Sequence, residues 1–582
     1  MWNFYKYQGN NSFYKYSSFI NQKILILVPH EDDEINLIGA TLVGLSKQKC
    51  QIKCAYLTNG DFGFNGETRL KEALNALQIL GVKEEDVIFF GFGDNMTNKN
   101  FHIYNCPSDD ILNSSAEVNY TYGLKNHPDY STQCNGIAAP YSRKAIVENI
   151  CHLLKDYKPD IIFCIDFDFH ADHRALSLFF EEALCILLKE TGNSYFPIIY
   201  KGFAYSTAWF SKPDFYALNI LSTVQPQNEH EEYCESAMDN PFFNWEKRIR
   251  FPIPPDVLSY TIRNNPIYYA LKKHKSQTAQ RKALSIINGD QIFWGRNTNS
   301  LSYQCEVSAS SGNIEKITDF KLMDSWTVLP KRTNAEASLW IPAFDDKDKH
   351  IRLILNEPKQ IHHISIYENP NQLHHIEECK IKLSNGQEII YNDILNNGNE
   401  SRIVIESTDL ISHIDLWITK FTGNLAGIAE IEIYDKIIRN QMAFIKLMEN
   451  NNFVYNFIVN SKQSMIDLQV YYYDGLEPHT LSIEDDNVIV KESPPNSIKI
   501  HKNSIYLLPG YKKIKLKVCL KDNMDIYDEI IIMRWDFFKK NIYKCLMLFD
   551  WLIFKVTTHY EYKFKRQRGI KNEYKQYKKA RN

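Results

Sequence analysis

The chain has 582 residues, of which 44% are hydrophobic and 24% are charged, proportions typical of a folded globular protein. This length exceeds what one hydrophobic core supports, so we expect several domains. A net charge of −3 excludes an overall basic field that would attract nucleic acid, and we expect no nucleic-acid partner.

The sequence carries no clear targeting signal. Its first twenty residues are aromatic and polar and lack the basic start and apolar stretch of a secretory signal. No uninterrupted apolar run reaches the roughly 18–20 residues that a membrane-spanning helix needs. The 12 cysteines are scattered without a CxxC pair, a pattern that favours buried thiols in a reducing compartment. We therefore expect a cytoplasmic protein.

Between about residues 20 and 300, short apolar strands alternate with longer amphipathic helices. This alternation predicts a parallel sheet with helices on both faces, whose ligands bind beyond the carboxyl ends of the strands. Residues 95–145 interrupt the rhythm with polar residues, proline and tyrosine, as a long insertion or lid does. The predicted strands are 24–28, 52–57, 87–90 and 161–165, and the predicted helices are 35–45, 68–80 (ended by Gly81) and 176–188.

After about residue 300, strand-like segments separated by turn signals dominate. They predict one β-sandwich over residues 303–436 and a second over 440–535, for which an immunoglobulin-like fold is one interpretation. The predicted strands of the first unit are 351–355, 361–367, 379–383, 403–405, 413–418 and 431–434, and those of the second are 453–459, 465–473, 487–491 and 514–519.

Residues 536–582 form an amphipathic basic tail. An apolar and aromatic stretch, 537–556, is followed by nine basic and two acidic residues between positions 561 and 581. This composition predicts an interfacial helix attracted to anionic lipid, which would place the protein on the inner face of a membrane. The alternative is a helix packed on the β-domains with a solvated basic end.

The first chemical signal, His30-Glu31-Asp32-Asp33-Glu34, follows the predicted strand 24–28. Imidazole and carboxylate are standard zinc ligands. Consecutive carboxylates repel one another unless a cation or solvent compensates them. The alternative is a solvated acidic turn that opens a helix, where Asp and Glu complement the helix dipole.

The second signal, His170-Ala171-Asp172-His173, lies between the predicted strand 161–165 and the next helix. Both motifs therefore open onto the same crevice. Two histidines and one aspartate would leave an open position for water at a metal, which is the arrangement that catalysis needs. A further carboxylate and imidazole remain for acid–base chemistry.

These motifs resemble the (A/P)HPDDE and HxDH motifs of the PIG-L/LmbE-like family of zinc-dependent N-deacetylases. The resemblance covers about residues 22–300 and implies a Rossmann-like α/β fold over residues 20–300. Supporting matches are Thr58-Asn59-Gly60-Asp61, then Arg69, Glu72, Ala76 and Leu80-Gly81, and a segment from Ala270 to Gln277 similar to the family's ALxxHxSQ pattern.

The resemblance implies a role for each motif residue. His30, Asp33 and His173 would bind Zn²⁺, and Asp32 would be the general base that activates the water on the metal. His170 would stabilise the tetrahedral intermediate or act as an acid, and Asp172 would orient a histidine. Arg69 is a candidate substrate-binding residue, with an exposed helix charge as the alternative. For His274, Ser276 and Gln277 we expect a packing or domain-closing role.

The sequence departs from the family pattern at two positions. Glu31 replaces the usual proline and adds a negative charge beside the site. Asp168 stands where some relatives carry a tyrosine that assists the intermediate. Tyr120 or Tyr122 of the insertion is a candidate replacement.

The region 303–436 resembles a discoidin-like (galactose-binding-like) sandwich, because it opens with Val307-Ser308-Ala309-Ser310-Ser311-Gly312 and closes with Ile428-Ala429-Glu430-Ile431-Glu432-Ile433-Tyr434. Such modules commonly bind sugars or lipid headgroups. The alternative is a purely structural sandwich packed on the catalytic domain. We therefore expect a deacetylase acting on an N-acetylhexosamine in a glycoconjugate. The alternatives are a metal-dependent amidase for a non-sugar amide and a non-catalytic carbohydrate-binding protein.

Overall fold

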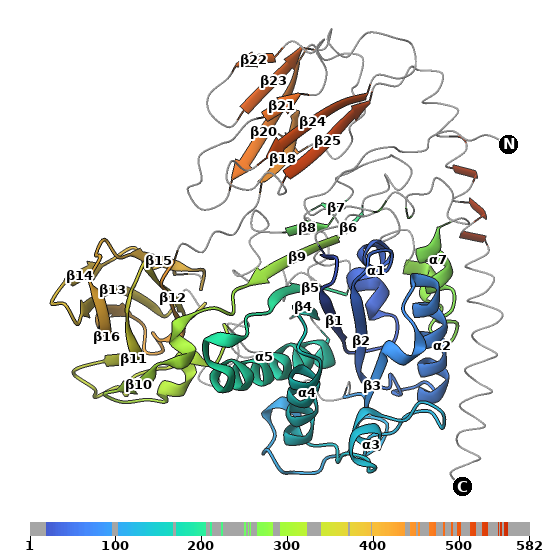
Figure 1. Cartoon of the computed structure of the whole chain (residues 1–582), viewed down its shortest axis with the longest axis horizontal. Helices are drawn as coiled ribbons and strands as arrows, with labels where there is room; N and C mark the ends of the chain where they lie inside the picture. Colours follow the sequence, from blue (N-terminus) through green and yellow to red (C-terminus); the bar gives the residue numbers. More distant parts are fainter. Residues whose placement is uncertain are drawn as a thin grey trace.

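The computed structural model describes residues 19–95, 103–166, 170–204, 291–322 and 339–436, except 371–372 and 397. Elsewhere it describes shorter stretches: 210–211, 223–224, 249–251, 254, 257, 265–282, the strands between 443 and 533, and helical positions 545, 548, 549, 552, 553, 555 and 556. Three groups of elements are visible in Figure 1: an α/β domain and two β-sheet units.

The first domain is built on a seven-stranded sheet with the order β3-β2-β1-β4-β5-β9-β8. Strands β1 to β5 run parallel, whereas β9 pairs antiparallel with both β5 and β8. This topology confirms the mostly parallel, Rossmann-like sheet. Its strands are β1 (Lys23–Val28), β2 (Gln51–Thr58), β3 (Val87–Phe92), β4 (Ile161–Ile165), β5 (Ile198–Gly202), β8 (Ile249–Phe251) and β9 (Gln291–Arg296).

The α-helices of this domain form two groups. Helices α1 (Asp33–Ser46), α2 (Gly66–Leu80) and α7 (Pro266–Leu271) contact one another, and α4 (Arg143–Tyr157) contacts α5 (Ala171–Thr191). Right-handed crossovers between parallel strands place the two groups on opposite faces of the sheet. Helix α2 ends at Gly81, whose φ of 89° is the left-handed conformation expected at this cap.

The insertion of residues 95–145 is ordered where the structure describes it. It contains the short helix α3 (Tyr130–Asn135), and α4 begins before its predicted end. Short pairings and helical turns complete the domain and its exit: β6 (Phe210–Ser211), β7 (Thr223–Val224), η2 (Glu84–Asp86), η3 (Ile103–Asn105), η4 (Gly192–Ser194), η7 (Ala279–Lys282), η8 (Leu301–Gln304) and η9 (Ile314–Thr318).

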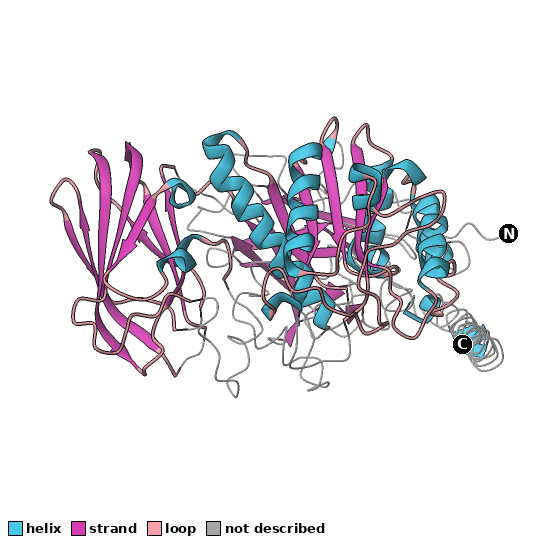
Figure 2. Ribbon diagram, turned by 90° about the horizontal axis from the view of Figure 1, so that it is seen from below, coloured by secondary structure: helices cyan, strands magenta, loops and turns pink. Residues whose placement is uncertain are grey.

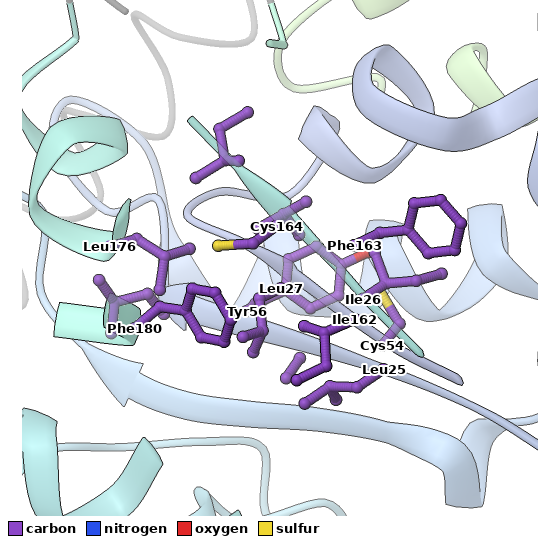
Figure 3. Packing of buried hydrophobic residues seen from close by; sticks show 14 of the residues in the cluster. Leu25, Ile26, Leu27, Cys54, Tyr56, Ile162, Phe163, Cys164, Leu176 and Phe180 are labelled. Carbon is purple, nitrogen blue, oxygen red and sulfur yellow. The ribbon is translucent and has the colours of Figure 1, made fainter. Parts of the chain in front are cut away.

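The core of the α/β domain lies between the sheet and its helices. Leu27 of β1, Tyr56 of β2 and Cys164 of β4 are fully or almost fully buried, and Phe180 of α5 packs near them (Figure 3). Strands with continuous apolar runs are buried on both faces, as a parallel sheet requires. This packing holds the carboxyl ends of β1 and β4 side by side, because the two strands are hydrogen-bonded neighbours.

The first β-unit is a sandwich of two antiparallel sheets around one apolar core. A five-stranded sheet, β10-β11-β16-β13-β14, faces a three-stranded sheet, β15-β12-β17. Figure 2 shows it as a layer of strands beside the helix-covered first domain. The strands are β10 (Glu306–Ala309), β11 (His350–Gln360), β12 (His363–Glu368), β13 (His375–Leu383), β14 (Glu388–Tyr391), β15 (Ser401–Val404), β16 (Leu410–Thr422) and β17 (Ile428–Tyr434).

The second β-unit also has two antiparallel sheets, β19-β18-β20-β23-β22 and β21-β24-β25. Strand β18 contacts β24 and β25, so the sheets face each other. Most of the predicted strand 453–459 and most of the predicted strand 487–491 lie outside the described residues. The strands are β18 (Ala443–Glu449), β19 (Asn452–Phe453), β20 (Met465–Tyr472), β21 (Leu481–Ile483), β22 (Val490–Glu492), β23 (Ser497–His501), β24 (Lys513–Cys519) and β25 (Tyr527–Met533).

The sequence predicts no membrane-spanning helix and buried free thiols, and the structure bears on both expectations. Among the described residues, none of the helices combines the length and apolarity that crossing a bilayer requires. The described cysteines are free, and six of them are buried: Cys54, Cys106, Cys151, Cys164, Cys185 and Cys379.

Candidate active site

The two predicted motifs lie at the carboxyl ends of neighbouring strands. Residues 29–34 follow β1 and lead into α1, and residues 170–173 follow β4 and lead into α5. Because β1 and β4 are parallel and paired, these turns meet at one edge of the sheet. The rings of His30 and His173 have their centroids 5.2 Å apart, and both side chains are buried.

Asp33 joins the two motifs. Its Oδ2 lies 3.0 Å from Nδ1 of His30 and 3.1 Å from Nε2 of His173. These are the three residues predicted to bind the metal, and the structure brings them into direct contact. Burial raises the pKa of Asp33, but His173 and His30 outweigh this effect and hold that pKa well below its usual range.

His170 and Asp172 complete the cluster. The His170 ring lies 4.6 Å from that of His30 and 4.7 Å from that of His173, measured between centroids. Asp172 Oδ2 lies 3.2 Å from Nε2 of His30, and both Asp172 oxygens accept from the Asn95 backbone N–H. Asp172 thus contacts His30 more closely than His170, whose Nδ1 lies 4.0 Å from the same oxygen, while its orienting role stays a prediction.

The protonation of the histidines is set by their neighbours. Burial lowers the pKa of His30, but hydrogen bonds to Asp172 and Asp33 hold it well above the usual value. Burial, together with the charges of His30 and His173, holds the pKa of His170 well below the usual value. A metal binds only the deprotonated ring, so metal binding at His30 would release a proton.

Asp94 is a member of the cluster that the sequence reasoning missed. It follows β3, and its Oδ1 lies 3.9 Å from Nε2 of His30. A carboxylate directly beyond the end of a third parallel strand was the available signal. Among the residues that the structure describes, two sets of buried groups could hold a metal ion, with ligand atoms within 4.8 Å of one another in each set: His30, His170 and His173; and His30, Asp94 and Asp172.

The donor set suits a divalent cation. Imidazole nitrogens and carboxylate oxygens are ligands that zinc takes in proteins. Asp94 Oδ1 is buried and accepts no hydrogen bond from the part of the chain that the structure describes. A buried carboxylate oxygen that lacks a hydrogen-bond donor is costly, and a nearby cation would remove that cost.

Arg69 of α2 is buried rather than displayed on the helix surface. Its guanidinium donates to the carbonyls of Gly60 (2.9 Å) and Glu31 (2.7 Å), and its Nε lies 3.2 Å from the Glu31 carboxylate. The alternative of an exposed helix charge is thus wrong. These contacts tie α2 to the loop of the first motif, while substrate contact by Arg69 stays a prediction.

Glu31, which replaces the family's proline, is fully buried against Arg69. Burial raises the pKa of Glu31 to about 8, although the Arg69 charge lowers it. Gly60 leaves the room for this pair, because a Cβ at that position would lie 2.2 Å from Arg69 Cζ and 2.4 Å from Glu31 Oε2.

Asp32 has an unusual backbone conformation. Its φ of 121° is positive, which is rare for a residue with a side chain, and its side chain makes no capping hydrogen bond to α1. Such a conformation costs on the order of 1–3 kcal/mol and is found mainly at functional sites, where the surroundings enforce it. The proposed base therefore sits on a loop that needs support.

Two tyrosines of the insertion were candidates to assist the reaction. Tyr122 donates to Asp61 Oδ2 at 2.9 Å, and Asp61 Oδ1 in turn accepts from the Asp94 backbone N–H at 3.0 Å. Tyr120 is 48% exposed. Tyr122 is thus connected to the site through Asp61, and Asp168 lies outside the described residues.

Two stretches of the chain match known protein families. Residues 25–184 match the PIG-L family model, described as GlcNAc-PI de-N-acetylase, which confirms the resemblance seen in the two motifs. Residues 300–434 match a family described as a domain of unknown function, DUF7402.

Several solved structures are similar. N,N'-diacetylchitobiose deacetylase from Pyrococcus horikoshii is 18% identical; the match covers 31% of this chain and 60% of that chain, with a TM-score of 0.21. A deacetylase of the teicoplanin biosynthetic pathway is 12% identical; the match covers 47% of this chain and 98% of that chain, with a TM-score of 0.26. A family 32 carbohydrate-binding module from Clostridium perfringens NanJ is 15% identical; the match covers 23% of this chain and 95% of that chain, with a TM-score of 0.18. The chain therefore spans less than two thirds of the Pyrococcus enzyme.

Proposed function

We propose that this chain, whose residues 25–184 match the PIG-L family, is a zinc-dependent N-deacetylase acting on an N-acetylhexosamine unit of a glycoconjugate. The observation that carries the proposal is the convergence of His30, Asp33 and His173 from two strand ends into one buried cluster. The family description, which names an N-acetylglucosamine-containing substrate, supports the choice of sugar class.

His30, Asp33 and His173 would hold the metal. Bound there, zinc would polarise an amide carbonyl and would lower the pKa of a water molecule to about 7. Asp32 takes the proton from the attacking water, which adds to the acetyl carbon. The C–N bond then breaks, acetate leaves, and the sugar nitrogen receives a proton to become a free amine.

The remaining residues of the cluster support these steps. His170 stabilises the negative charge that develops on the carbonyl oxygen or protonates the leaving amine. Asp172, at 3.2 Å from Nε2 of His30, keeps that ring oriented. Arg69 holds the turn at Glu31 and the turn at Gly60 in place through its two carbonyl contacts, and we retain substrate contact as a further role.

Acetate release from a panel of N-acetylated sugars and glycolipids tests the proposal. We expect release from at least one N-acetylhexosamine compound, loss of activity after treatment with a chelator, and recovery when zinc is added. Activity that survives complete metal removal would contradict the metal-dependent mechanism. Activity confined to non-sugar amides in the same panel would instead favour the amidase alternative.

A further inference from the structure

The loop that carries Asp32 is held by a segment far away in the sequence. Glu34 accepts from the Asp32 backbone N–H through Oε2 at 2.9 Å. Its other oxygen, Oε1, lies 2.9 Å from Nε2 of His274, just after α7. Both side chains are completely buried, so water does not substitute for either contact. A continuous path of hydrogen bonds thus runs from His274 through Glu34 to the backbone of Asp32.

The segment that contains His274 also contacts the loop at a second point. Gln277 donates through Nε2 to the carbonyl of Glu31 at 2.7 Å, and Arg69 donates to this carbonyl as well. Ser276 anchors the segment to α2, because its backbone N–H and hydroxyl both donate to the carboxylate of Glu72 at 2.7–3.1 Å. The Glu31–Asp32 peptide group is therefore held at both its carbonyl and its N–H.

This support coincides with the positive φ of Asp32. A residue in such a conformation relaxes when its backbone partners are lost, unless other contacts enforce it. Rotation of the Asp32 backbone would change the direction in which its carboxylate points. A general base works only within hydrogen-bond reach of the proton that it takes.

We propose that His274 and Gln277 are positioning residues for the general base, with His274 acting through Glu34 on the backbone of Asp32 and Gln277 acting on the neighbouring carbonyl. This inference rests on the proposed function, because it assigns Asp32 the role of base. It replaces the packing or domain-closing role expected for His274 and Gln277 from the sequence. The competing explanation is ordinary helix capping by Glu34, in which His274 only fills space.

The test uses full-length, zinc-loaded protein with His274→Phe, which keeps a ring but removes the donor, and His274→Gln, whose amide can donate to Glu34. We expect His274→Phe to lower kcat about ten- to a hundredfold, the usual effect of losing a supporting contact at a metal site, while KM and zinc content stay unchanged. His274→Gln should recover most of the rate. Combined with Asp32→Ala, His274→Phe should cause no further loss, because the two residues act as one unit.

A second readout is independent of activity. We expect amide hydrogen exchange in a peptide covering residues 28–36 to accelerate in His274→Phe and to return toward the wild-type rate in His274→Gln. His127→Phe is the matched control, since His127 is also buried and its Nε2 contacts the Val87 carbonyl at 2.9 Å, without a bond to the loop. It should leave exchange in this peptide unchanged.

Three results would overturn the positioning role: unchanged exchange and kcat in His274→Phe, loss of zinc in that variant, or an equal rate loss with and without Asp32. Failure of the proposed function looks different. In that case Asp32→Ala and the wild type would release acetate equally, or neither would release it, while the exchange experiment would still report whether His274 holds the loop.

Discussion

Asp32 and His173 have different proposed tasks, and single substitutions separate them. Asp32→Ala removes the base without touching the proposed ligands, so turnover should fall about 10²–10⁴-fold while zinc stays bound. His173→Ala removes a ligand, so zinc and activity should be lost together. Metal analysis of the purified variants, alongside acetate release, measures both. Loss of zinc from Asp32→Ala would show that this carboxylate is itself a ligand.

A second pair of substitutions decides which carboxylate binds the metal. Asp33 contacts both His30 and His173, whereas Asp94 lies 3.9 Å from His30 alone. We therefore expect Asp33→Ala to abolish stoichiometric zinc binding and Asp94→Ala to retain it. Isothermal titration of the metal-free proteins measures the affinities. The opposite ranking would assign the metal to the set of His30, Asp94 and Asp172.

Site residues could be predicted where the neighbouring sequence determines their position, and could not be predicted where contacts with distant residues determine it. The members of the two motifs were found because each motif directly follows a buried strand, and adjacent parallel strands bring their ends together. Asp94 was not predicted because the polar stretch after β3 has the composition of the start of an insertion. The Glu34–His274 contact joins residues 240 positions apart, and no local pattern encodes such a pairing.

Among the elements, buried strands were predicted best. The bounds of β4 agree with the expected 161–165, since its five residues form a continuous apolar run that is fully buried. Helix α4 was missed because its start falls inside the polar insertion, although Ser142 caps it by accepting from the Ala145 N–H. Strand β9 was missed because its antiparallel pairing with β5 is decided by tertiary contact.

At the same scale, Glu368 at the end of β12 predicts a pH dependence of sandwich stability. Its oxygens lie 2.8 Å from His375 Nδ1 and 2.7 Å from the Ile376 N–H, and burial raises its pKa to about 7 despite these contacts. Because the folded state binds this proton more tightly than the unfolded state, stability should fall as pH rises from about 4.5 to about 7. The shift corresponds to about 3 kcal/mol in all.

Calorimetric unfolding of Glu368→Gln and the wild type at pH 5 and pH 8 measures this effect. The variant lacks the ionisable group, so its stability relative to the wild type should increase between the two pH values. Glu388→Gln is the control, because Glu388 is exposed and paired with Lys380, which lowers its pKa. Its stability difference should not rise with pH. A flat difference for Glu368→Gln would show that the carboxyl group titrates normally.

At the scale of the whole molecule, the α/β domain and the first sandwich are joined by polar contacts rather than by a free linker. The Cζ atom of Arg296, in β9, lies 4.2 Å from the centroid of the Phe320 ring. Its Nη2 atom lies 3.7 Å from Oε1 of Glu432 in β17. Gln304 donates to the Leu188 carbonyl of α5, and the Ile433 N–H donates to Ser300. Any ligand of the sandwich would thus be held at a defined distance from the proposed metal site. Nothing in the local sequence pattern predicts this arrangement.

The tail supplies the last prediction, which concerns where this assembly acts. At its described helical positions, Leu548, Phe549, Leu552 and Val556 are 46–67% exposed and follow the three- and four-residue spacing of one helix face. The nine basic residues that follow in the sequence lie outside the described residues. We propose that this apolar face enters the interface of an anionic membrane while the basic residues pair with its headgroups.

Sedimentation with vesicles tests this membrane association. The full-length protein should bind vesicles that contain phosphatidylserine, bind less to neutral phosphatidylcholine vesicles, and dissociate as salt is raised, because headgroup attraction is screened. Replacing Phe549 and Leu552 by serine should abolish binding. Ile390→Ser is the matched control, since Ile390 is 69% exposed on β14, away from the tail in sequence. If the wild type instead forms a dimer that the double serine variant dissociates, and no vesicle binding is seen, the apolar face serves self-association and the membrane proposal is wrong.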